Sequence, residues 1–317
     1  MKRAIGFFLC LLLSAGILAG CGPHTAGENG KIRVVTTFFP LYDWVKEIAG
    51  DDDCVAVTAL LDNGVDLHSY QPTADDIITI STCDVFVYVG GESDEWVDDV
   101  LKSADNRKMT VVDLMDVLGD RVKAEEHVEG MQSEEEAEEE EDEHVWLSLR
   151  NAAICCRAVA DALGEVDAQH KSGYDANADA YIARLNALDA RYRETVAAAP
   201  VKTLLFADRF PFRYLVEDYG LSYYAAFAGC SAESEASFET VAFLAGKVDE
   251  LGLTAILQIE GADGKLAETV KQQTRAKDQK ILTLDSLQSV TGDRAAEGAT
   301  YLSVMEDNLA VLADALN

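Results

Sequence analysis

Basic side chains are scarce in this sequence. Its 317 residues contain 26 lysines and arginines against 57 aspartates and glutamates, which gives a formal net charge of -31. A phosphate backbone would be repelled by this charge, and no local basic patch offsets it. The sequence therefore excludes nucleic acid as a partner.

Paired cysteines are also missing. The chain has seven cysteines, and Cys10 and Cys21 lie in the N-terminal leader, so five remain. An odd number without C-x-x-C spacing argues against a disulfide framework. Adjacent Cys155 and Cys156 lie in an apolar helical pattern, so we expect them to be buried thiols.

What the N-terminus does have is an export signal. Met1–Arg3 is basic, and Ile5–Leu13 is apolar but too short for a stable membrane span. Leu18-Ala19-Gly20-Cys21 resembles the bacterial lipobox, in which the cysteine is lipidated after cleavage. We therefore expect a signal peptide at 1–20, lipidation of Cys21, a tether at 21–31, and a mature chain anchored at the extracytoplasmic face of the cell membrane.

Hydrophobic residues make up 49% of the chain, enough for a large core, and their pattern predicts an α/β fold. Apolar runs rich in β-branched residues recur, and helical patterns follow them. The expected strands are Ile32–Thr36, Val55–Leu60, Val85–Val89, Thr110–Val112, Thr203–Ala207, Thr254–Ile259 and Ile281–Leu284.

The longest helical pattern, about Ser172 to Ala198, lies between these two groups of strands. Tyr181, Leu185, Leu188, Tyr192 and Val196 form one apolar stripe on it, and Ser172 could cap it. The pattern predicts two lobes, each a mainly parallel sheet with flanking helices, joined by one long rigid helix. The expected boundaries are 32–165 for the N-terminal lobe, 166–200 for the connecting helix and 201–317 for the C-terminal lobe.

The negative charge is concentrated in one segment. Twelve acidic residues lie between Glu125 and Glu143, and this run leads directly into His144. We expect a solvated acidic loop at 125–143, whose carboxylates would attract divalent cations.

Polar side chains lie where the predicted strands end, the place where open α/β sheets bind ligands. His68 lies in the loop after the second strand, and His144 begins a helical pattern. Three carboxylates follow strands of the second half: Asp208, Glu260 and Asp285. Imidazole nitrogens and carboxylate oxygens together suit a divalent transition metal such as zinc or manganese.

At these residues the sequence resembles the metal-binding lipoproteins of zinc and manganese ABC importers. Asp66-Leu67-His68-Ser69-Tyr70 looks like the first histidine motif of that family, usually Asp-Pro-His. Glu143-His144-Val145-Trp146 looks like the second, usually Asp-Pro-His-x-Trp. Further similarity lies in Thr37–Leu41, Asp218–Leu221 and Thr283–Ser286, and it covers nearly all of 32–317.

The resemblance implies a metal held between two lobes by two ligands from each. His68 and His144 would come from the N-terminal lobe and Asp285 from the C-terminal lobe. Where relatives have a histidine or glutamate ligand, a gapless count back from Tyr214 reaches Arg209, which has no lone pair to donate. We expect Asp208 to be the fourth ligand, with Glu260 or a water as the alternative, and Arg209 to pair with one of these carboxylates.

The resemblance further implies a monomer that binds Zn²⁺, or else Mn²⁺, and delivers it to the permease subunit of an ABC importer. Three other functions are compatible with parts of the sequence. A metallohydrolase would use similar ligands, but no H-E-x-x-H motif is present. A binding protein for an organic solute or metal chelate, or a surface lipoprotein for cell adhesion, would not need His68.

Overall fold

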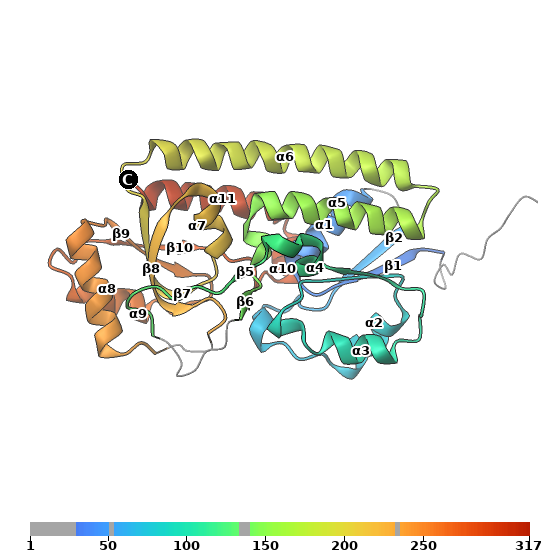
Figure 1. Cartoon of the computed structure of the whole chain (residues 1–317), viewed down its shortest axis with the longest axis horizontal. Coiled ribbons are helices and arrows are strands. Elements are labelled where there is room, and N and C mark those ends of the chain that lie inside the picture. Colours follow the sequence, from blue (N-terminus) through green and yellow to red (C-terminus); the bar gives the residue numbers. More distant parts are fainter. Residues whose placement is uncertain (1–29, 51–53, 133–139, 232–234) are drawn as a thin grey trace, which may run out of the picture.

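The computed structural model describes residues 30–50, 54–132, 140–231 and 235–317 (Figure 1). The predicted signal peptide, Cys21 and the tether up to residue 29 lie outside these ranges. No helix in the described ranges is long and apolar enough to cross a bilayer.

Two four-stranded parallel sheets form the framework of the molecule, which confirms the predicted fold class. The first has the order β2-β1-β3-β4 and the second the order β10-β9-β7-β8. Their strands are β1 (Ile32–Thr36), β2 (Val55–Ala59), β3 (Val85–Tyr88), β4 (Thr110–Asp113), β7 (Thr203–Phe210), β8 (Ser222–Ala228), β9 (Ala255–Ile259) and β10 (Lys280–Leu284). A short antiparallel pair, β5 (Lys123–Ala124) and β6 (Glu141–Asp142), lies beside them.

Helices flank both sheets (Figure 1). On the N-terminal side these are α1 (Phe39–Ala49), α2 (Ala74–Thr82), α3 (Val97–Ser103), α4 (Leu114–Leu118) and α5 (Leu149–Val166). On the C-terminal side they are α7 (Arg213–Tyr219), α8 (Phe238–Leu251), α9 (Lys265–Gln273), α10 (Gly292–Ala296) and α11 (Tyr301–Ala315). Parallel strands need such crossovers, which bury both sheet faces.

In the second sheet, one strand was not predicted and the end of another was predicted wrongly. Strand β8 was not predicted, because Ala225, Ala226 and Ala228 give it few of the β-branched residues that mark strands. Strand β7 was predicted to end at Ala207 but runs to Phe210, with a register shift between Phe206 and Arg209. Asp208 therefore lies inside the strand rather than after it.

The long helix α6 (Lys171–Ala198) runs along both sheets (Figure 1). Its 28 residues correspond to about 42 Å. The predicted stripe is buried against α5, α1 and α11. Helix α6 begins one residue before Ser172, which therefore lies inside the first turn and is not its cap.

Helix α11 makes a second connection between the halves, one that the sequence did not suggest. The Tyr301 amide donates to Asp43 Oδ2 of α1 at 2.9 Å, and the Tyr301 ring packs edge-on against Trp44 with centroids 5.2 Å apart. The Tyr301 hydroxyl donates to the Trp146 carbonyl at 2.6 Å. The C-terminal segment thus begins its last helix on the N-terminal half.

Asp43, at this junction, makes the stability of the fold depend on pH. Burial raises its pKa from 3.8 to about 6, despite the amide of Tyr301. An acid whose pKa is raised by folding lowers stability as pH rises between the unfolded and folded values. Asp43→Asn should therefore raise the free energy of unfolding at pH 7 by roughly 2 kcal/mol and flatten its decline between pH 4 and 6. Urea titrations between pH 4 and 7 measure this free energy, and the exposed Asp120→Asn serves as the control. If the free energies of wild type and Asp43→Asn changed with pH in parallel, the raised pKa of Asp43 would not contribute to stability.

Candidate metal site

His68 is held at the end of the loop that follows β2. It lies in a single 3-10 turn, Leu67–Ser69, capped by Asp66, whose Oδ1 accepts from the His68 amide at 3.1 Å. The ring Nδ1 contacts Ser93 Oγ and Glu143 Oε1, each at 2.8 Å. These contacts direct Nε2 towards His144.

His144 follows β6 and is fully buried. Its backbone amide and its Nδ1 both contact Asp142 Oδ1 at 2.9 Å. Burial alone would lower the pKa of His144, but the Asp142 carboxylate outweighs it and raises the pKa above its ordinary value. The two imidazoles meet with 3.1 Å between their Nε2 atoms.

The carboxylates of Glu143 and Asp142 determine which nitrogen of each histidine ring can bind a metal. With Nδ1–H donated to Glu143 or Asp142, each imidazole would carry its lone pair on Nε2 once any proton there has left, and this is the arrangement that orients histidine towards a metal. Burial would raise the pKa of Glu143, but the His68 contact lowers it below the usual value, so Glu143 is the charged partner.

Glu143→Gln should therefore weaken zinc binding by about 10–100-fold, since an amide stabilises the required tautomer of His68 less well than a carboxylate. Competition with a zinc chelator measures the change, and exposed Glu165→Gln serves as the control. Equal affinities for the two variants would show that Glu143 is only a structural partner.

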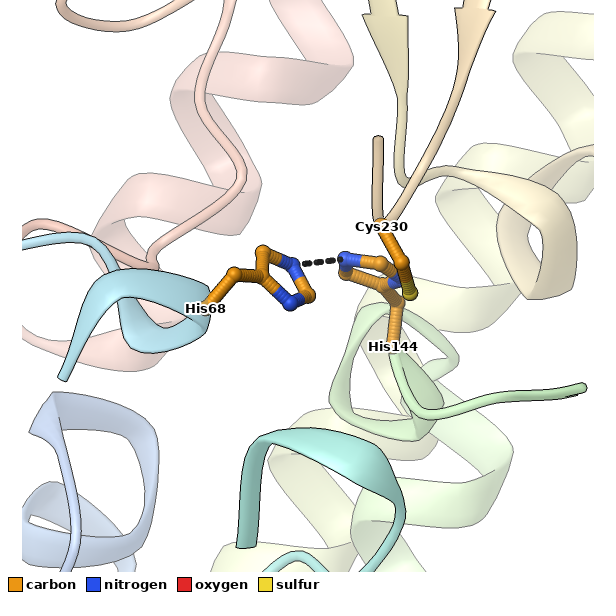
Figure 2. Close-up of side chains that lie close together, drawn as sticks. All are labelled: His68, His144 and Cys230. Carbon is orange, nitrogen blue, oxygen red and sulfur yellow. Dashed lines mark hydrogen bonds between the residues drawn. The ribbon is translucent and has the colours of Figure 1, made fainter. Parts of the chain in front are cut away.

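A third side chain, Cys230, completes the group (Figure 2). In the described ranges, one set of three histidine, cysteine or acidic residues brings its ligand atoms within 4.8 Å of one another: His68, His144 and Cys230. Cys230 follows β8 and is half-buried. Sequence reasoning missed it because β8 was missed, although the apolar run Tyr223–Ala228 ending in Gly-Cys was a usable signal.

The predicted oxygen ligands are held elsewhere by other groups. Asp208 Oδ2 accepts from the Ile259 amide at 3.1 Å, and Asp285 Oδ2 pairs with Arg294 at 2.7 Å. Glu260 accepts from the amide and the hydroxyl of Ser286, both at 2.6 Å. In the described ranges, the structure does not bring Asp208, Asp285 or Glu260 into the set of close ligand atoms that includes His68.

Arg209 forms an ion pair, but with a carboxylate that the sequence had not suggested. Its guanidinium lies 2.6 Å from Asp66 Oδ2, so it joins the C-terminal half to the turn that carries His68. Burial would raise the pKa of Asp66, and Arg209 reverses this and lowers it. Gln288 also reaches across: with its amide oriented to satisfy both ends, it accepts from His144 Nε2 at 2.9 Å.

The site opens into a cleft of about 1320 Å³ between the two halves. His68, Cys230, Asp208, Arg209 and Glu260 all line it. Loops after strands of both sheets form its walls, as expected for the carboxyl ends of parallel strands.

The acidic run is more ordered at its ends than a solvated loop. Asp142 and Glu143 are buried, and Glu125 Oε1 accepts from the Cys230 amide at 3.1 Å. Gln132 accepts from the Ser237 amide at 2.8 Å. The expectation of a wholly solvated segment was therefore wrong for these residues, because Asp142 and Glu143 hold the two histidines while Glu125 and Gln132 contact the opposite half of the molecule. Residues 133–139 lie outside the described ranges.

Two α/β halves with an imidazole pair in the cleft between them define a metal-type solute-binding protein. The chain belongs to the family described as "ZnuA: Zinc-uptake complex component A periplasmic", which matches residues 34–315. It is 32% identical to the high-affinity zinc uptake system protein ZnuA of Bacillus subtilis over 99% of this chain and 98% of that protein.

Two further comparisons concern Streptococcus pneumoniae. The chain is 32% identical to the zinc-binding lipoprotein AdcA over 95% of this chain, and it spans 58% of the length of that relative. The crystal structure of the Zn(II)-bound ZnuA-like domain of AdcA superposes with a TM-score of 0.72 at 31% identity, covering 90% of this chain and 99% of that domain.

Proposed function

We propose that this chain captures zinc in the cleft between its halves and delivers it to the permease of an ABC importer. The observation that carries the proposal is the His68–His144 pair, whose Nε2 atoms lie 3.1 Å apart while both Nδ1 atoms contact carboxylates. When a metal displaces the proton between them, two imidazoles so oriented offer two lone pairs to one cation. Relatives named for zinc binding and zinc uptake support the choice of metal.

The C-terminal half would supply the remaining ligands. Asp208 and Asp285 are the oxygen donors proposed from the sequence, and each would have to leave its present partner, the Ile259 amide or Arg294. Glu260 is the alternative, although its two bonds to Ser286 fit a role in holding the loop after β10. Removal of a true ligand would weaken binding far more than removal of a cleft carboxylate.

The remaining parts of the proposal concern the chain in its cell. We propose a lipid anchor at Cys21, a position at the extracytoplasmic face, a monomeric state and no catalytic activity. Family membership and relatives named as lipoproteins support the membrane location.

Isothermal titration of the purified mature protein with zinc and with manganese tests the function. We expect one tight zinc site, lost in His68→Ala and retained in His170→Ala, whose imidazole pairs with Asp167 at the start of α6. Asp208→Ala and Asp285→Ala decide between the oxygen donors. Zinc binding no tighter than micromolar in the wild type would overturn the proposal.

A further inference from the structure

Two imidazoles are too few for a tight zinc site, because protein zinc sites use three or four side-chain ligands. Arg209 cannot ligate and is paired with Asp66. The cleft carboxylates Asp208 and Glu260 accept hydrogen bonds from the chain around them. A third donor must therefore be sought next to the histidines.

Cys230 is positioned to be that donor. Its sulfur and the two ring nitrogens lie within 4.8 Å of one another. Around a tetrahedral zinc, ligand atoms at the usual Zn–N and Zn–S bond lengths lie roughly 3.3–3.7 Å apart. The two Nε2 atoms, at 3.1 Å, already have nearly this spacing, and the sulfur, within 4.8 Å of a nitrogen of each ring, has to approach by roughly 1 Å, a side-chain adjustment.

The residues that follow β8 bring the Cys230 backbone close to His144. A Cβ on Gly229 would lie 2.9 Å from His144 Cε1 and 3.0 Å from the Phe210 carbonyl, so only glycine lets the backbone come this close to the imidazole. The next amide, that of Cys230, donates to Glu125 Oε1 at 3.1 Å. The acidic segment and the glycine together fix the position of the thiol.

We propose that Cys230 is the third zinc ligand and that its thiolate makes the site select zinc over manganese. This inference rests on the proposed function, since it assigns a ligand to the same cleft. A thiolate is soft and favours zinc, whereas manganese prefers oxygen donors. A His₂Cys set with one oxygen from the C-terminal half therefore reverses the manganese preference that a His₂Asp₂ set would carry.

The proton balance of this step is simple. Burial, followed by neighbouring carboxylates including Glu143 and Glu125, raises the pKa of the Cys230 thiol in the metal-free protein. When Zn²⁺ binds, the S–H proton leaves to solvent and a Zn–S bond replaces it, because a coordinating thiol is deprotonated by the cation. The thiolate offsets one of the two positive charges in this partly buried place.

X-ray absorption at the zinc edge tests the ligand directly. The zinc-loaded wild type and Cys54→Ser should show one sulfur neighbour at about 2.3 Å, and Cys230→Ser should show only nitrogen and oxygen. Cys54 is a suitable control because its carbonyl accepts from the amide of Ile32, the first residue of β1, at the amino end of the strands and away from the cleft. A wild-type spectrum without sulfur would overturn the inference and leave the proposed function standing.

Titrations separate the two proposals further. Cys230→Ser should weaken zinc binding by more than about 100-fold, beyond the loss typical of an outer contact, and Cys230→Asp should weaken zinc while strengthening manganese. Unchanged zinc and manganese affinities in both variants would refute the role of Cys230. Failure of the proposed function would look different: the wild-type protein, with Cys230 in place, would bind no zinc.

Discussion

Replacing His144 with alanine is expected to weaken zinc binding by about two to three orders of magnitude. Structural zinc sites gain roughly 10–16 kcal/mol from about four ligands, so each ligand contributes on the order of 3 kcal/mol. His144 is fully buried, with Asp142 at its Nδ1 and His68 at its Nε2, so its lone pair is not easily replaced by a water molecule. Chelator competition measures the change.

The same substitution should lower stability in the absence of metal. It leaves a cavity and removes the imidazole that pairs with the buried Asp142 carboxylate, at a cost of about 2–4 kcal/mol. The control is His170→Ala, which removes an imidazole from its carboxylate partner Asp167 near the start of α6. If His144→Ala bound zinc within threefold of the His170→Ala protein, His144 would not be a ligand.

Trp146→Ala is expected to lower the free energy of unfolding by about 3–5 kcal/mol and to weaken zinc binding as well. The ring is fully buried and packs against Phe38, with centroids 4.7 Å apart, and against His144 at 5.2 Å. Its Nε1 donates to the Ser286 carbonyl of the other half at 2.8 Å. One side chain thus supports the histidine and joins the two halves.

A matched pair of tryptophan variants separates packing from hydrogen bonding. Trp146→Phe leaves the Ser286 carbonyl without its donor and should cost about 1–2 kcal/mol beyond the lost ring area. Trp44 is equally buried, but its Nε1 has no acceptor among the residues that the structure describes, so Trp44→Phe removes an unpaired donor and should cost less. Urea titration of both variants provides the comparison. Equal losses would mean that the Trp146–Ser286 bond adds no stability.

Periodicity in the sequence was enough for most of the framework. Seven of the eight strands of the two sheets and the long helix were predicted, because β-branched runs and a 3.6-residue apolar stripe are local signals. Strand β8 escaped because alanine carries no such signal, and its place was decided by pairing with β7. The contact between helix α11 and Asp43 could not be predicted, since nothing local in the sequence connects residues so far apart.

The residues of the site also fall into those that local sequence motifs predict and those that only the tertiary structure brings together. The sequence by itself determined that His68 and His144 stand in recognisable motifs. Only the tertiary structure decided that Cys230 is their neighbour, that Arg209 pairs with Asp66, and that Asp285 is held by Arg294. Motifs record short-range chemistry, whereas the contacts of Cys230 and Arg209 depend on how the two sheets are set against each other, because Cys230 follows β8 and Arg209 lies in β7. The Asp285–Arg294 pair depends instead on how α10 folds back onto the end of β10.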